Sequence, residues 1–565
     1  MRSALSEVMM NKKYSIGLDY GTESGRAVLV DVSNGEVVAQ CTKIYTHGVM
    51  DEYLPDGSTK LPMDFALQHP MDYLEVAEYT IPKVLKESGV SPEDVVGIST
   101  DFTSCTILPI DAEGTPLCVK PQFVHNPHAY VKLWKHHAAQ PEANVVTELA
   151  EQRGEGFLAR YGGKISSEWL QPKIMQILDE APEVFDAADR IIEAADWLNL
   201  MLTGEERRSS CMAGYKGMWH KKDGYPTKDF MAALDPRLED LAEKKLCGPV
   251  CPLGGKAGEL TAEWAVRLGL RAGTAVGISI IDAHAGLPGA GIAGPGKLMM
   301  IMGTSTCHIM LSETENMMPG VCGIVEDGVL PGYFAYEAGQ SCGGDHYAWL
   351  VKNFVPEAYE KEAKERGIGV HQLLTEKASA QKPGAHGLLA LDWWNGNRTP
   401  YADYDLTGMM LGMNLTTKAE DMYRALIEAT AYGTNFVIET FERAGIQIQK
   451  LYACGGIAKK NPMMMQIYAD VTGREIHVSA SDQTPALGAA IFGAVAAGKE
   501  RGGYDSIEDA VAAMSSPVER VYKPIEGNAA VYAKLYAEYR EMSEYFAKQN
   551  DVMKRLKAIK AEAQS

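Results

Sequence analysis

The chain has 565 residues, of which 46% are apolar, 23% charged and 8% aromatic. This composition is typical of a soluble globular enzyme, and the length predicts two domains of about 250 residues each. The formal net charge of −20 excludes general nucleic-acid binding, because a polyphosphate partner needs a basic surface.

Neither a targeting segment nor a membrane segment is predicted. The first residues, MRSALSEVMMNKK, lack the apolar core of a signal peptide, and no run of 18 apolar residues occurs. We expect residues 1–13 to be an N-terminal extension, with Met10 as an alternative start. Cys247 and Cys251 are the one close cysteine pair, a weak indication of a metal site, so we expect ordinary thiols in a cytoplasmic protein.

The first half of the chain alternates strands and helices. Apolar alternation and short turns predict a β-meander at its start, and apolar positions three and four residues apart predict the first helix. The predicted elements, in chain order, are strands over 14–19, 26–31 and 37–45, a helix over 71–89, strands over 95–100 and 106–110, a mostly helical region over 126–275, and a buried strand over 275–281.

The opening pattern returns near the middle of the chain. Residues 16–31 (IGLDYGTESGRAVLVD) and 297–310 (KLMMIMGTSTCHIM) each place a Gly-Thr turn between two apolar strands. A repeat at this distance predicts a fold duplicated once rather than a short-period solenoid. The later predicted elements are strands near 333–337, 450–453 and 475–478, and helices over 418–444, from 461, over 485–498 and over 527–562.

Domain boundaries follow from this repeat and from the loose segment GAGIAGPG, residues 289–296. We expect an N-terminal domain over 14–294, a C-terminal domain over 295–545, and a helical tail over 546–565. The charged helix that leads into the tail is expected to dock on the body of the protein through one face. That face carries Tyr532, Leu535, Tyr536 and Tyr539.

The two Gly-Thr turns predict a polyphosphate site. Such a turn exposes backbone N–H groups and hydroxyls together, a concave arrangement that binds phosphate oxygens. One such turn is weak support, because Gly and Ser also serve turn geometry alone, but two that face each other across a cleft are stronger. The predicted phosphate-binding residues are Thr22, Glu23, Ser24 and Arg26 in the first turn and Gly303, Thr304 and Ser305 in the second.

Asp19 ends the first strand beside the first turn. A carboxylate next to bound phosphates is unfavourable unless a cation lies between them, and Mg²⁺ prefers carboxylates, waters and phosphates. The turn is therefore predicted to bind Mg-ATP, with Asp19 holding the metal through water. The alternative is that Asp19 only caps the turn.

A third motif, YACGGIAKKNPMMMQIYAD at residues 452–470, suits a nucleoside. Gly455 and Gly456 end a predicted strand and let a flat group approach the backbone. Asn461 precedes Pro462, a favourable pair for beginning a helix. We expect adenine and ribose to lie on this loop.

These three motifs together resemble the phosphate and adenosine motifs of the actin, hexokinase and heat-shock chaperone superfamily. Within it the chain resembles the FGGY carbohydrate kinases, through GMMLGMNLTTKAEDMYRALIE (408–428), WWNGNRTP (393–400) and TPALGAAIFGAVAAG (484–498). The resemblance covers about residues 14–545. It implies an α/β fold of two ribonuclease-H-like domains flanking a catalytic cleft, the use of MgATP, and a homodimer; it also implies that helix 484–498 lies on the nucleotide side.

Asp282 is the predicted catalytic base. It ends a buried strand and precedes Ala-His-Ala-Gly, small residues that let a ligand approach. By the resemblance it occupies the place of the family's catalytic aspartate, which takes the proton of the sugar hydroxyl. The alternative is a helix N-cap, and His284 is expected to pack or to contact ligand.

The resemblance also implies a sugar pocket. Segments 126–140, 166–173, 213–220 and 336–349 resemble the family members that phosphorylate L-ribulose in L-arabinose breakdown, while Asp101 and the residues after it depart from the Arg-Glu pair of glycerol-specific members. This assigns transfer of phosphate from ATP to L-ribulose. The implied sugar-binding residues, besides Asp282, are Asp101, Ser104, Trp134, Lys216 and Glu337. Lys216 as a surface charge and Trp134 as a core residue stay open.

Three other functions compete with this one. A different sugar, such as D-ribulose, xylulose or ribitol, needs only a few relocated polar groups. A noncatalytic ATP-binding switch would need a separate client-binding domain, and the predicted nucleotide fold takes almost the whole length. A dinucleotide-dependent dehydrogenase would need a G-x-G-x-x-G after an early strand, and GLPGAG at 286–291 lies in the wrong context.

Overall fold

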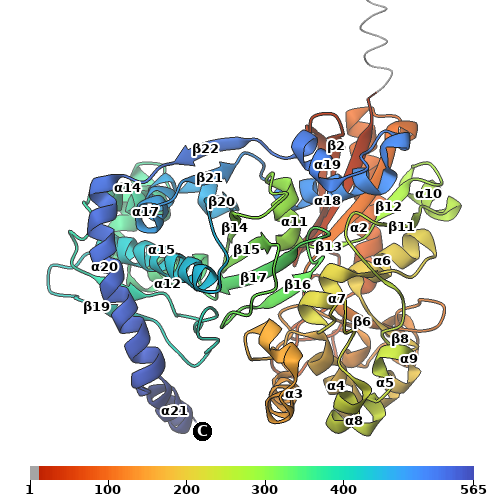
Figure 1. Ribbon diagram of the computed structural model, residues 1–565, viewed down its shortest axis with the longest axis horizontal. Coiled ribbons are helices and arrows are strands. Elements are labelled where there is room, and N and C mark those ends of the chain that lie inside the picture. The colour runs from red at the N-terminus through yellow and green to blue at the C-terminus, as the bar shows by residue number, and fades with distance from the viewer. Residues whose placement is uncertain (1–11, 565) are drawn as a thin grey trace, which may run out of the picture.

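The computed structural model describes residues 12–564 and shows two lobes, each built on a large mixed β-sheet (Figure 1). Nearly all of the predicted N-terminal extension, residues 1–13, lies outside the described residues. The first sheet has the strand order β11-β12-β5-β1-β2-β3, with β13 also paired to β5. Its strands are β1 (Tyr14–Tyr20), β2 (Ser24–Asp31), β3 (Val37–Ile44), β5 (Val95–Phe102), β11 (Lys256–Glu259), β12 (Ala275–Gly277) and β13 (Ile280–Ile281).

The second sheet has the order β16-β17-β15-β14-β20-β21-β22. Its strands are β14 (Lys297–Met302), β15 (Thr306–Ser312), β16 (Gly323–Glu326), β17 (Phe334–Gln340), β20 (Lys450–Cys454), β21 (Ile476–Ser479) and β22 (Val518–Tyr522). Helix α15 (Ala419–Arg443) buries a long apolar face in the core of this lobe, where it packs against α14, α17 and β18.

The two sheets share one topology, which confirms the predicted ribonuclease-H-like duplication. In each, a central strand pairs antiparallel with the next strand along the chain and parallel with a later one: β1 with β2 and β5, β14 with β15 and β20. A third antiparallel strand (β3 or β17) and a further parallel strand (β12 or β21) extend each sheet, and an antiparallel edge strand (β11 or β22) follows.

A mostly helical region between β5 and β12, joined by residues 50–68 from the segment after β3, forms its own hydrophobic core. It carries a four-stranded sheet, β4 (Leu67–Gln68), β7 (Val131–Lys132), β6 (Ile107–Ile110) and β8 (Arg190–Glu193), and the pair β9 (Arg208–Ser209) and β10 (Val250–Cys251). The predicted strand over 106–110 therefore exists as β6 but belongs to this small sheet. The pair β18 (Leu389–Leu391) and β19 (Met409–Leu411) lies in the second lobe.

The helices of the first half and of the inserted region are α2 (Pro70–Ser88), α3 (Gln140–Arg153), α4 (Leu170–Glu180), α5 (Pro182–Ala187), α6 (Ala194–Thr203), α7 (Ser210–Lys216), α8 (Lys228–Leu234), α9 (Leu241–Lys244), α10 (Ala262–Leu268) and α11 (Asp282–Gly289). Those of the second half, besides α15, are α12 (Gly344–Phe354), α13 (Glu357–Glu365), α14 (Val370–Ser379), α16 (Gly456–Lys460), α17 (Pro462–Thr472), α18 (Thr484–Ala497), α19 (Ile507–Met514), α20 (Glu526–Glu544) and α21 (Val552–Gln564). No helix within residues 12–564 is long and apolar enough to cross a bilayer.

Helix α18 differs from its expected placement on the nucleotide side. It packs against β1, β5 and β12 of the first sheet, and Figure 1 shows it, with α19, in blue beside the red strand β2. The backbones touch: a Cβ on Gly17 would lie 1.8 Å from the Ala486 carbonyl oxygen, and one on Gly97 would lie 2.0 Å from that of Gly493. The small residues of this helix therefore serve close packing across the two halves of the chain.

The strand predicted over 275–281 is interrupted. β12 and β13 both pair parallel with β5, but Ile278 and Ser279 lie between them outside the ladder. The buried Ser279 hydroxyl is bonded to Thr100 Oγ1 at 2.5 Å and accepts a bond from Asn199 Nδ2 at 2.9 Å. These polar contacts hold the break in place, and β13 delivers Asp282 directly after Ile281.

The C-terminal helix docks on the second lobe, as predicted. Tyr532 and Tyr539 of α20 are fully buried, and Leu535 and Tyr536 pack against the same core. Tyr539 donates a hydrogen bond to the buried Asp392 at 2.8 Å.

Candidate active site

A cavity of about 810 Å³ is lined by residues from both halves of the chain. The sequence placed its predicted site residues far apart along the chain, and the fold collects many of them here. The predicted residues on its wall are Thr22, Ser104, Trp134, Lys216, Asp282, Ser305 and Glu337. Residues predicted for phosphate and residues predicted for sugar thus line one cavity.

The two Gly-Thr turns meet at this cavity through Thr22 and Ser305. Each is closed by its glycine amide: Gly21 N donates to Ser24 O, and Gly303 N donates to Ser305 O, both at 3.0 Å. The Trp134 indole N–H donates to Thr22 Oγ1 at 3.1 Å, so the inserted region helps to orient the first turn. Glu23 is exposed at the tip of that turn.

The glycine-rich loop predicted for adenosine lies beside the second turn. β20 runs parallel to β14, with Cys454 opposite Ile301, so Gly455 follows directly next to the end of β14. Gly455 has φ 99°, and an added Cβ would lie 2.4 Å from Met302 O, so only glycine fits there. The short helix α16 follows, which the sequence did not predict, and Asn461 caps α17 by accepting from Met464 N at 3.0 Å.

Asp282 is the first residue of α11 and faces the cavity. Its Oδ1 accepts a 2.6 Å hydrogen bond from the Ala283 backbone N–H. Desolvation of Asp282 by the surrounding protein, and next the charge of Asp19, raise the pKa of this carboxyl to about 7. A carboxylate with this pKa is poised to accept a proton near neutral pH.

Asp19, Asp101 and Asp282 form an acidic cluster at the carboxyl ends of neighbouring strands. Asp19 and Asp101 lie opposite each other in the β1–β5 ladder, and Asp101 is in turn opposite Ile280. Burial raises the pKa of Asp19, although the guanidinium of Arg26, with Nε 3.4 Å from Asp19 Oδ2, acts against it. Burial, Asp19 and then Asp282 raise the pKa of Asp101 well above its ordinary value.

The structure does not place Asp101 on the cavity wall, contrary to the expectation that it contacts sugar. Its side chain is fully buried, and neither carboxylate oxygen has a hydrogen-bond partner among the described residues. A cation beside Asp19 and Asp101 would relieve the repulsion of these neighbouring acids and supply a partner for the unsatisfied Asp101 oxygens. Asp101 thus lies beside Asp19, behind the cavity wall.

Lys216 and Glu337 form a buried ion pair between the halves of the chain. Lys216 ends α7 and Glu337 lies in β17, with Nζ and Oε2 3.1 Å apart. Lys216 is therefore not a free surface charge. Burial opposes ionisation of Glu337, but Lys216, His284 and Arg398 together lower its pKa, so both partners are charged and offer a donor and an acceptor to the cavity.

His284 is buried, with Nε2 3.6 Å from Glu337 Oε2 and its ring 4.2 Å from that of Tyr215. Burial lowers the pKa of His284 to about 4. A neutral imidazole of this low basicity is a poor general base, which favours Asp282 in that role.

Sequence reasoning missed several residues on the wall, among them Arg398, Glu168 and Cys307. Arg398 lies in the loop WWNGNRTP, and no carboxylate among residues 12–564 forms an ion pair with it. Nothing local in the sequence indicates that its guanidinium reaches the cavity, because the other residues that line the cavity are distant from Arg398 along the chain.

The fold and this cavity together define a two-domain carbohydrate kinase, and the comparisons with known proteins identify the family. Residues 14–289 match the N-terminal domain, and residues 298–497 the C-terminal domain, of the FGGY family of carbohydrate kinases. The chain belongs to that family.

Curated relatives match along almost the whole chain. A protein named ribulokinase from Bacillus licheniformis is 58% identical over 537 residues, which cover 95% of this chain and 97% of the relative. A ribulokinase from Geobacillus thermodenitrificans is 57% identical over 558 residues, covering 98% and 99%.

Solved structures share the fold at low sequence identity. The xylulose kinase from Rhodospirillum rubrum matches with a TM-score of 0.76 and 24% identity, covering 94% of this chain and 99% of that one. The gluconate kinase from Lactobacillus acidophilus matches with a TM-score of 0.78 and 18% identity, covering 95% and 99%.

Proposed function

We propose that this chain phosphorylates L-ribulose with MgATP, giving L-ribulose 5-phosphate and ADP. The observation that carries the proposal is that Thr22 and Ser305, from the two phosphate-binding turns, line the same cavity as Asp282, Lys216 and Glu337. A phosphoryl donor held by the turns would point into the space that holds the acceptor hydroxyl. The names of the similar curated proteins support ribulose as the acceptor.

In this proposal the 5-hydroxyl oxygen of the sugar attacks the γ-phosphorus of ATP. The bond from that phosphorus to the β,γ-bridging oxygen breaks, ADP leaves with the electron pair, and Asp282 takes the hydroxyl proton. Because the transition state is loose, the alcohol loses its proton late, and a carboxylate with a pKa of about 7 is basic enough. Lys216 and Glu337 would orient the sugar hydroxyls.

The chain's acids fit the metal that this reaction needs. Asp19 would hold Mg²⁺ through water, with Asp101 behind it contributing charge. When bound, Mg²⁺ neutralises negative charge on the β- and γ-phosphates. Arg26 Nε, 3.4 Å from Asp19 Oδ2, would keep the carboxylate oriented toward the first turn. Closure of the two lobes would exclude water, which competes as an acceptor.

We further infer that the chain forms a homodimer, as its resemblance to the FGGY carbohydrate kinases implies, and that it lies in the cytoplasm. All ten cysteines are free thiols, six of them buried, as suits a reducing compartment. Light scattering on the purified chain would test the dimer, with a monomer mass contradicting it.

A coupled ADP-release assay tests the function. MgATP is supplied with L-ribulose, D-ribulose, L- and D-xylulose, ribitol, glycerol, or water alone. The highest kcat/KM with L-ribulose supports the proposal. A higher value with another sugar would contradict the acceptor while leaving the kinase intact, and no rate above the water blank would favour a noncatalytic ATP-binding switch.

A further inference from the structure

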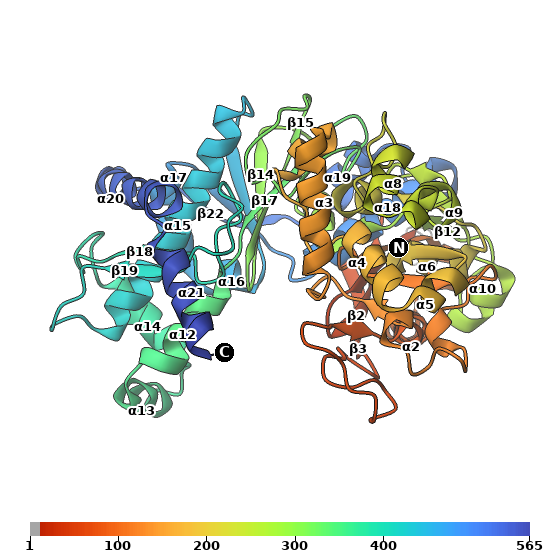
Figure 2. The same ribbon diagram turned by 90° about the horizontal axis from the view of Figure 1, so that it is seen from below.

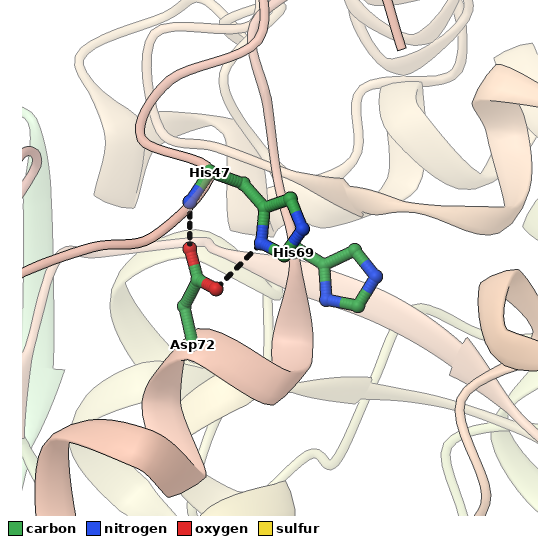
Figure 3. Close-up of side chains that lie close together, drawn as sticks. All are labelled: His47, His69 and Asp72. Atoms are coloured by element: carbon green, nitrogen blue, oxygen red, sulfur yellow. Dashed lines mark hydrogen bonds and ion pairs between the residues drawn. The ribbon is translucent and has the colours of Figure 1, made fainter. Parts of the chain in front are cut away.

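A group of metal-ligating side chains lies outside the kinase cavity, on the surface between β3 and α2 (Figure 3). His47 follows β3, His69 immediately precedes α2, and Asp72 lies in the first turn of that helix. One ligand atom from each of the three lies within 4.8 Å of the others. We propose that these residues form a binding site for a transition-metal dication of the Zn²⁺ type.

Contacts within the group hold the ligands in place. The buried Asp72 carboxylate accepts from the His47 backbone N–H at 2.9 Å through Oδ2, and its Oδ1 lies 2.7 Å from His47 Nδ1. The two imidazole rings stack 4.3 Å apart at an interplanar angle of 20°. Figure 3 shows the Asp72 carboxylate facing the backbone and ring of His47, with the His69 ring lying beside the His47 ring.

The donor set selects the kind of ion. Two imidazole nitrogens and one carboxylate oxygen suit Zn²⁺, Co²⁺ or Ni²⁺, whereas Mg²⁺ takes oxygen ligands in an octahedron. Zinc lies about 2.0–2.2 Å from such donors, so its ligands stand roughly 3.4 Å apart in a tetrahedron. The exposed His47 ring can rotate to reach this spacing, and water would complete the coordination.

Metal binding at this site would compete with one hydrogen bond of the protein. His69 caps α2 by accepting from Met71 N–H at 3.3 Å through Nδ1, a long hydrogen bond. The ion would take this nitrogen from the cap. Binding would also tie the loop after β3 to α2, next to Gln68, whose Nε2 donates to Thr22 O at 2.7 Å. A bound ion would therefore stabilise the support of the first phosphate-binding turn.

Calorimetric titration of the untagged full chain with ZnCl₂, after chelation and dialysis, tests the proposal without ATP or sugar. We expect one ion per chain, a higher Tm with zinc, visible absorption bands of nitrogen-bound Co²⁺ when CoCl₂ replaces zinc, and no competition from MgCl₂. His47→Gln and His69→Asn should each weaken binding at least tenfold. Asn at position 69 keeps a good helix cap.

The matched control is His125→Gln. His125 Nδ1 lies 2.6 Å from Asp56 Oδ2, a similar His–Asp pair. Among residues 12–564 this pair belongs to no group of three possible metal ligands, so the variant should bind zinc like the wild type. Absence of binding to the wild type would overturn the proposal. Wild-type affinity in both His47→Gln and His69→Asn would also overturn it, because the ion would then lie elsewhere, for example at Cys247 and Cys251.

Discussion

The ammonium of Lys216 lies 3.1 Å from the carboxylate of Glu337, and this ion pair joins the first half of the chain to the second inside the cavity. Both side chains are buried. The contact thus couples the relative position of the lobes to the chemistry of the site.

Removing one partner leaves an uncompensated buried charge. Lys216→Met and Glu337→Gln should each lower the free energy of unfolding, by about 3–5 kcal/mol where the remaining charge stays buried. The double variant should recover much of the stability but not the activity. Urea denaturation with steady-state kinetics checks this, and full stability in both single variants would show that the pair is not buried in solution.

Asp282→Asn should lower kcat by about 10²–10⁴-fold, since the amide keeps the shape but accepts no proton. Sugar binding, measured by calorimetry, should stay close to that of the wild type. Near-normal turnover would sink the assignment of Asp282 as the base.

The pH profile follows from the same residue. The base must be ionised, so kcat/KM should rise with pH through about 7, the raised pKa of Asp282, and fall about tenfold per unit below it. Because the charge of Asp19 contributes to that rise, Asp19→Asn should move the midpoint to lower pH. A profile without an acidic limb between about pH 5.5 and 8 would contradict this account.

Arg398 presents a guanidinium to the cavity, with no ion pair to a carboxylate among the described residues. We expect Arg398→Met to raise the KM for sugar about 10–100-fold, the effect of losing a hydrogen bond to a charged group, with a smaller change in the KM for ATP. Arg398→Lys keeps the positive charge, so its KM for sugar should lie between those of the wild type and Arg398→Met. An equal rise in both KM values would indicate a structural role.

Trp134 orients the first Gly-Thr turn, the predicted phosphate site, through its bond to Thr22 Oγ1. Trp134→Phe removes the N–H and keeps most of the ring. The KM for ATP should rise about threefold to tenfold, the cost of one neutral hydrogen bond. Initial-rate kinetics at saturating sugar measure this, and an unchanged KM would mean that the turn is held by its other contacts, such as Gln68.

Local patterns in the sequence determined the duplicated fold and the turns. The strands around Gly21-Thr22 and Gly303-Thr304 are marked by apolar runs, and the turn residues follow from short-range stereochemistry, so both appear in the structure as β1–β2 and β14–β15. Helix α15 was also predictable, because its apolar positions follow the helical period over 25 residues. The break at Ser279 was not, since it depends on hydroxyl and amide partners from β5 and α6.

Only the tertiary structure decided which of these elements touch. It put α18 against Gly17 and Gly97 of the first sheet, buried Asp101 beside Asp19, joined Lys216 to Glu337, and brought Arg398 to the cavity. It also gathered His47, His69 and Asp72. Periodicity and turn chemistry act over a few residues, whereas these contacts arise from packing between segments far apart in the chain. The sequence next to each of these residues does not indicate which distant residue it will contact.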